Sequence, residues 1–135
     1  MEQSAYWNLT ASGLEMGGCC LSVNLRDYAR FGQFILDGAK IGGRSIVPAD
    51  WLGQATTKQV DISVQGRGYG YQWWTIDDGT FEARGIFGQS IFIDPIRRLV
   101  IATIGNWPTP TDAATLSPAR AAFFRAVQAD IDAGK

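Results

Sequence analysis

The chain has 135 residues, 46% of them hydrophobic and 19% charged, a mixture typical of one globular domain and not of a disordered or fibrous chain. Twelve basic against thirteen acidic side chains leave no basic surplus to attract nucleic acid, and no apolar run reaches the ~18 residues of a membrane span. The complete lack of histidine excludes Ser-His-Asp and Cys-His mechanisms.

Residues 1–23 contain scattered glycines and no sustained period, so we expect loop with a short strand or turn. Within this stretch, Cys19 and Cys20 are neighbours in the chain. Adjacent cysteines are poorly placed to bridge each other in ordinary backbone geometry, so we expect two small buried side chains and no disulfide within the chain. With no histidine to complete a metal site around these thiols, we expect no metal and no other cofactor.

Residues 25–37 carry the strongest helical pattern. Asn24 can cap the first turn, Asp27 suits the positive helix start, and Gly38 is a good stop. One helical face collects the apolar residues of a core element: Leu25, Tyr28, Ala29, Gly32, Ile35 and Leu36. A turn over residues 40–44, a short helix over 49–57 and a loop over 58–68 are expected to follow.

From residue 69 the period changes to that of strands. Apolar, β-branched or aromatic runs cover residues 69–76, 81–87, 90–93 and 99–104, with turn residues between them. Connections this short make neighbouring strands antiparallel, which predicts an antiparallel meander.

A final helix is expected to open at Ser117-Pro118, after an irregular loop. Its apolar face would consist of Phe123, Phe124, Val127 and Ile131. The predicted fold class is therefore α+β, an antiparallel sheet meander with packed helices, in a single unit over residues 1–135.

Most catalytic motifs are absent from the sequence. No lysine has a serine three positions before it, so there is no Ser-x-x-Lys, and Gly-x-Ser-x-Gly is also missing. Tyr6-Trp7-Asn8 matches a Tyr-x-Asn pattern, but without a nucleophile an aromatic anchor is the favoured interpretation. Residues 66–70 are glycine-rich but precede a strand and not a helix, so a phosphate loop is not predicted.

Carboxylates receive no catalytic role at this point. Asp77-Asp78 with Glu82, and Asp94 alone, could serve as acids or bases, but the aspartates coincide with turns, where Asp is common. The run Gly85-Ile86-Phe87-Gly88-Gln89 is more informative, because glycines at a strand edge let a ligand approach and a free N–H there can donate to an oxyanion. A bulge or turn explains the same residues without a function.

A wider pattern surrounds that run. Residues 83–95, with Gly70-Tyr71-Gln72-Trp73-Trp74 before them and residues 99–104 and Asn106-Trp107-Pro108 after them, resemble the C-terminal part of serine hydrolases of the class C beta-lactamase and penicillin-binding-protein type. Within that type the likeness is greatest to 6-aminohexanoate-dimer hydrolase and related carboxylesterases. Residues 25–32 are similar to the family's Arg-Asp-x-Ala-Arg-Phe-Gly helix, and Gly17-Gly18 and residues 46–51 fit the same order.

The resemblance implies acyl transfer. A serine of Ser-x-x-Lys would attack an ester or amide carbonyl while the lysine and a Tyr-x-Asn tyrosine handle protons. Aligned on Asp94-Pro95, the family's third motif falls on Ala83-Arg84-Gly85, and Ile86 takes the position whose backbone N–H completes the oxyanion hole. Ala83 replaces the cationic or imidazole residue of that motif, which favours an amidase or esterase. Further substrate contacts implied by the resemblance are those of Phe87, Gly88, Gln89 and Trp107.

Two classes of function follow from this resemblance. Ser-x-x-Lys and its tyrosine precede residue 1 in the family's order, so we expect this chain to supply one wall of a cleft for a small ester or amide substrate and to be inactive alone. The alternative is a non-catalytic binding or self-associating module, because residues 99–104 would form an unpaired apolar edge. An incomplete gene product or an excised segment is a third explanation.

Overall fold

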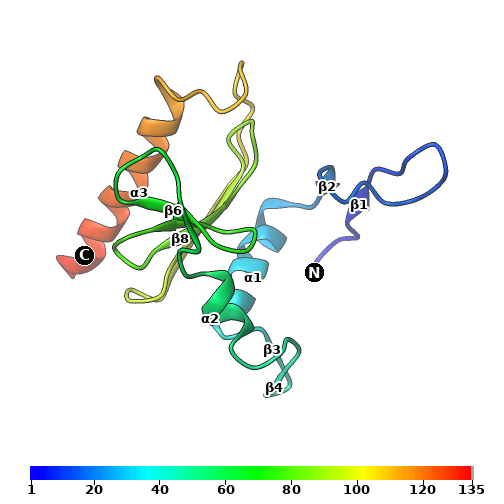
Figure 1. Ribbon diagram of the computed structural model, residues 1–135, viewed down its shortest axis with the longest axis horizontal. Coiled ribbons are helices and arrows are strands. Elements are labelled where there is room, and N and C mark those ends of the chain that lie inside the picture. Colours follow the sequence, from blue (N-terminus) through cyan, green and yellow to red (C-terminus); the bar gives the residue numbers. More distant parts are fainter. Residues whose placement is uncertain (135) are drawn as a thin grey trace.

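A six-stranded antiparallel sheet forms the centre of the computed structural model, which describes residues 1–134 (Figure 1). Its strands pair in chain order, each with its sequence neighbour. They are β5 (Val60–Asp61), β6 (Arg67–Tyr69), β7 (Trp74–Ile76), β8 (Phe81–Arg84), β9 (Ser90–Asp94) and β10 (Leu99–Thr103). This order confirms the predicted α+β class and antiparallel meander.

Helix α1 (Leu25–Leu36) packs on one face of the sheet, and its start is capped as expected. The Asn24 side chain accepts a hydrogen bond from the Asp27 N–H at 2.8 Å. Gly32 lies so close to the sheet that a Cβ there would be 2.5 Å from Val100 Cγ1 and 2.7 Å from Ile91 Cγ2. The buried core lies beneath this helix and consists of Ala55, Trp73, Phe81, Ile91 and Ile93.

Helix α3 (Leu116–Asp132) covers the opposite face. The Phe124 ring stacks on Phe92 with 4.7 Å between centroids. Of the predicted apolar face, only Phe124 is fully buried, whereas Phe123 and Ile131 are 51% and 39% exposed. The sheet surface under α3 carries Glu82 and Asp94, so polar contacts replace part of the expected apolar packing; Gln128, for example, donates to Asp94 at 2.7 Å.

Strand boundaries differ from the prediction at three places. The strand expected over residues 81–87 ends at Arg84, because the chain turns after it and the Gly85 N–H donates to the Gln89 carbonyl at 2.9 Å. The single strand expected over residues 69–76 is a hairpin, because the Gly70 N–H donates to the Trp73 carbonyl at 2.8 Å and Gln72 has a φ of 67°. Residues 58–68, expected to be loop, contain β5 and most of β6. The turn of the 69–76 hairpin was missed in the sequence because it lies in an aromatic run, where neither Tyr71 nor Gln72 is a strong turn residue.

Smaller elements lie around this body. A hairpin of β1 (Tyr6–Trp7) and β2 (Leu21–Ser22) extends away from the sheet, and a second hairpin of β3 (Lys40–Ile41) and β4 (Arg44–Ser45) lies near the short helix α2 (Trp51–Ala55) (Figure 1). In residues 1–134, no helix combines the length and apolarity needed to cross a membrane.

The expectation for the two cysteines is wrong. Cys19 and Cys20 form a disulfide, and both residues are exposed instead of buried. The prediction assumed ordinary backbone geometry, but Cys20 adopts a φ of 79°, in the left-handed region. The Trp7 indole N–H donates to the Cys19 carbonyl at 3.2 Å and so supports this turn from the neighbouring strand.

Candidate functional site

The turn between β8 and β9 contains most of the residues predicted to form the site, from Gly85 to Gln89; Ala83 and Arg84 end strand β8, and Trp107 lies in the loop after β10. Gln89 closes this turn with two of its oxygens. Its backbone carbonyl accepts from the Gly85 N–H at 2.9 Å, and its side-chain Oε1 accepts from the Phe87 N–H at 3.2 Å. A Cβ on Gly85 would lie 2.4 Å from that Oε1, so the glycine permits the Gln89 side chain to fold over the turn.

Ile86 is at the outer side of this turn, and its side chain is exposed. Its carbonyl accepts from the Thr111 N–H at 2.6 Å, whereas its own N–H donates to no group within residues 1–134. Strand β7 pairs with β8 only at Phe81 and Glu82, so the edge of β8 beyond them is uncovered. An unpaired N–H beside an uncovered strand edge can donate to an acceptor brought from outside.

Residues 103–111 run beside the turn and are bonded to it at three points. The Thr103 hydroxyl donates to the Gly88 carbonyl at 3.1 Å, the Trp107 N–H donates to the Phe87 carbonyl at 3.2 Å, and Thr111 binds Ile86 as described. The Trp107 ring lies against Gly88. The structure therefore brings Trp107 together with the turn, as the sequence predicted.

Charged side chains form a buried network on the α3 side of the turn. Glu82, 3% exposed, accepts from the Ser90 hydroxyl at 2.8 Å, pairs with Arg84, and lies 3.7 Å from Arg120 Nη2. Burial lowers the pKa of Arg120; Glu82 opposes this effect, and the nearby positive charges of Arg84 and Arg67 add to it.

Two of the predicted contact residues direct their side chains into the protein. Arg84 pairs with Glu82 and lies 5.3 Å from the centre of the Trp74 ring. The Ala83 methyl packs against the core under α1. By contrast, Ile86 and Phe87 are 56% and 38% exposed, so their side chains reach solvent at the turn.

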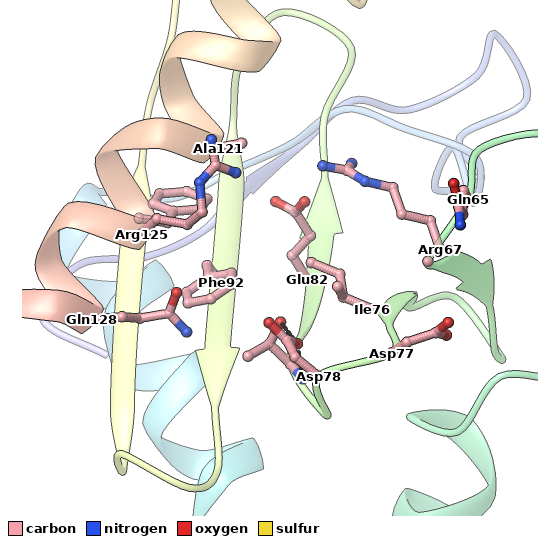
Figure 2. A pocket seen from close by; sticks show the side chains of 13 residues that line it. Gln65, Arg67, Ile76, Asp77, Asp78, Glu82, Phe92, Ala121, Arg125 and Gln128 are labelled. Carbon is pink, nitrogen blue, oxygen red and sulfur yellow. Dashed lines mark hydrogen bonds between the residues drawn. The ribbon is translucent and has the colours of Figure 1, made fainter. Parts of the chain in front are cut away.

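A hollow of about 380 Å³ lies elsewhere, between α3 and the sheet (Figure 2). Arg67 and Ile76 line it from the sheet, and Arg125 and Gln128 line it from the helix. Neither Trp107 nor any residue of the turn 85–89 lines it, so this hollow is separate from the candidate site.

The remaining candidate groups have local structural roles. Asp78 accepts from the Thr80 N–H at 2.9 Å, and Asp94 accepts from the Ile96 N–H at 3.0 Å, as expected for aspartates in turns. Over residues 1–134, no group of three or more His, Cys, Asp or Glu side chains is arranged to hold a metal ion.

Comparison with known proteins identifies the family. The beta-lactamase family model matches residues 3–124. This chain belongs to the beta-lactamase family. The α+β meander of this chain agrees with the fold of that family. The resemblance to serine hydrolases of the beta-lactamase type, predicted from the sequence, is confirmed.

Two relatives within the beta-lactamase family are informative. The chain is 32% identical over 112 residues to the 6-aminohexanoate-dimer hydrolase of Paenarthrobacter ureafaciens, a match covering 75% of this chain and 28% of that protein. It also matches the solved structure of a proposed 6-aminohexanoate-dimer hydrolase from Bacillus anthracis, with a TM-score of 0.71 and 29% identity over 82% of this chain and 30% of the other. The chain thus spans less than a third of the length of these relatives.

Three residues that contact the turn of this candidate site were not predicted from the sequence. Thr103 and Thr111 hold the turn through hydrogen bonds, and Arg120 reaches it from α3. Thr111 and Arg120 lie outside any motif, and Thr103 lies in the expected strand over residues 99–104 without a predicted role; contacts across the sheet end leave no periodic signal in a single sequence. For Arg120 the sequence contains a weak signal, because it is a charged residue within an otherwise small and apolar stretch of the final helix.

Proposed function

We propose that this chain forms one wall of the active site of a hydrolase that opens a small ester or amide by acyl transfer. In this proposal the Ile86 N–H is one of two donors to the oxyanion. The observation that carries it is the Ile86 N–H, which lies beside the uncovered edge of β8 and donates to no group within residues 1–134, whereas the N–H groups of Gly85 and Phe87 on either side of it both donate to Gln89.

The chemistry required of this wall is electrostatic. When a serine Oγ adds to the carbonyl carbon, its proton passes to a base and the carbonyl oxygen becomes an oxyanion. A preorganised N–H aimed at that oxygen contributes about 2.7–4 kcal/mol. The serine and its base belong to a Ser-x-x-Lys motif, which these 135 residues do not contain, so the proposal assigns the nucleophile to another segment or chain.

The proposed substrate contacts follow from the shape of the turn. Gly85 would contribute by letting the Gln89 side chain fold over the turn, and Phe87, Gly88, Gln89 and Trp107 would form the wall around the acyl group. Ala83 offers no charge to a carboxylate, and the Arg84 guanidinium is already paired with Glu82. An uncharged acyl group, in an ester or a linear amide, therefore fits this wall better than a beta-lactam carboxylate does.

The test is a chimera in which residues 1–135 replace the matching segment of the Paenarthrobacter hydrolase. We expect it to hydrolyse a p-nitrophenyl ester and to react with a serine-directed fluorophosphonate, whereas the 135 residues alone do neither. A chimera that folds, by circular dichroism, but does not hydrolyse the ester would contradict the proposal. Labelling of the isolated chain that is lost on replacing one of its serines would contradict it as well.

A second candidate function is self-association. It is supported by β10, which is the terminal strand of the sheet and pairs only with β9 within residues 1–134. An edge of this kind presents unpaired backbone groups to a further strand. Size-exclusion chromatography with light scattering tests it: a dimer or larger species supports this function, and a monomer at high micromolar concentration excludes it.

A further inference from the structure

Arg120 lies on α3, outside every motif of the sequence, and yet reaches the turn that carries the proposed oxyanion donor. Its side chain is only 10% exposed. Burying a guanidinium is costly unless its charge and its N–H groups find partners. The partners that Arg120 does find therefore indicate what it is placed to hold.

One partner is the backbone of the turn itself. Arg120 Nη1 donates to the Gln89 carbonyl across 3.5 Å, a long hydrogen bond. The same carbonyl accepts from the Gly85 N–H at 2.9 Å, so a single oxygen joins the arginine to the residue just before Ile86.

A second partner holds the other side of the turn. The Arg120 guanidinium lies 4.9 Å from the centre of the Trp107 ring, within the range of a cation–π contact. Trp107 in turn lies against Gly88 and donates its backbone N–H to Phe87. Arg120 thus restrains the turn through its closing carbonyl and through the indole that covers it.

The third partner fixes the arginine. Glu82 on β8 lies 3.7 Å from Arg120 Nη2 and supplies the negative charge that a buried cation needs. A planar guanidinium can contact a carboxylate, a carbonyl and a ring face at the same time, whereas a lysine ammonium is a single point charge. Arg120 makes all three of these contacts, as a guanidinium can and a lysine ammonium cannot.

We infer that Arg120 is a positioning residue that orients the Ile86 N–H by clamping the 85–89 turn between the Gln89 carbonyl and the Trp107 ring. This inference rests on the proposed function for its catalytic consequence. Its structural consequence, a loosened turn when the guanidinium is removed, does not depend on any activity.

Arg125 provides a matched control. It lies further along the same helix, is exposed, and forms no hydrogen bond, ion pair or cation–π contact with Glu82, Gln89 or Trp107 within residues 1–134. Figure 2 shows it on α3 at the hollow, which no residue of the turn 85–89 lines. Arg125→Ala removes the same charge from the same helix without touching the clamp.

The first experiment measures the turn directly in the 135-residue chain by NMR. In Arg120→Ala we expect the Gly85 amide to exchange at least about tenfold faster and the Trp107 indole N–H resonance to shift, while the Ile93 amide in the sheet stays protected. Arg125→Ala should change neither signal. Unchanged Gly85 exchange in a folded Arg120→Ala would overturn the inference; if that variant does not fold, Arg120→Lys and Arg120→Gln are measured in the same way.

The second experiment uses the chimera described above. Arg120→Ala should lower kcat about 10- to 100-fold with KM within about twofold, because misplacing the donor affects the transition state more than substrate binding. Arg120→Lys should recover only part of the loss. A change in KM alone would overturn the inference. An inactive unsubstituted chimera would instead count against the proposed function, and the NMR result would still decide whether Arg120 holds the turn.

Discussion

Trp107 lies flat against Gly88, so close that a Cβ on the glycine would be 2.4 Å from the indole Nε1. Gly88 also has a φ of 94°, which other residues rarely adopt. The contact joins the β8–β9 turn, which carries the proposed oxyanion donor, to the loop after β10.

Gly88→Ala is therefore expected to destabilise the chain by roughly 2–4 kcal/mol, combining backbone strain with a clash against the indole. Gly79→Ala is the matched control, because Gly79 has a similar φ of 85° but open space where its Cβ would lie. Gly79→Ala should lower the free energy of unfolding only by the backbone strain, about 1–2 kcal/mol. Urea unfolding of both variants measures the difference, and equal losses would show that the Trp107 contact contributes nothing.

Removing the Ile86 N–H itself tests the donor. In the chimera, Ile86→Pro deletes that N–H and should lower kcat by about 10²–10³-fold, the usual effect of losing one oxyanion donor. Ile86→Ala keeps the N–H and trims an exposed side chain, so its kcat should stay within about threefold. Comparable activity of the two folded variants would remove Ile86 from the mechanism.

Glu82 compensates the positive charges around it. Glu82→Ala would leave the paired Arg84 and the nearby Arg120 without their shared carboxylate, and should cost roughly 3–5 kcal/mol of folding free energy. Glu15→Ala, at an exposed glutamate with no ion pair in residues 1–134, is expected to change stability by less than about 0.5 kcal/mol. Thermal unfolding distinguishes the two, and a small effect at Glu82 would mean that the arginines find other partners.

Asp94 should make stability depend on pH. Burial alone would raise the pKa of this carboxyl, but hydrogen bonds from Gln128 and Arg97 hold it below its ordinary value of 3.8. The unfolded chain then binds the proton more readily, so this stabilisation is present above about pH 4 and is lost as pH falls through the lowered pKa.

Asp94→Asn is accordingly expected to lose on the order of 3 kcal/mol at neutral pH and to show a flatter decline in stability below about pH 4. Asp130→Asn, at an exposed position on α3 with no ion pair in residues 1–134, should keep the profile of the unsubstituted chain. Denaturant unfolding at several pH values makes the comparison. Parallel acid limbs for Asp94→Asn and the unsubstituted chain would refute the assignment.

Local signals made some of these features predictable from the sequence. The Asn24 cap, the turns at Asp78 and Asp94 and the strands β9 and β10 follow from short-range patterns, and the structure contains them all. The hairpin at Gln72 and the Cys19–Cys20 disulfide depend on residues with positive φ that are not glycine, for which the sequence has no strong signal.

The candidate site was predictable only in part, for a related reason. Its turn is a local motif and could be found, together with Trp107, through the family resemblance. The hydrogen bonds from Arg120 to Gln89 and from Thr111 to Ile86 join residues more than twenty positions apart in the chain, and no single-sequence pattern reports such pairs.

The strict chain order of the sheet has a consequence for how this region folds. Every strand from β5 to β10 pairs with the strand next to it in sequence, so each pairing closes only a short loop. Low contact order of this kind favours rapid folding, because little chain entropy is lost before each contact forms. The β8–β9 hairpin that presents Ile86 can thus assemble early, within a few residues of its own turn, and then serve as the template on which distant segments dock.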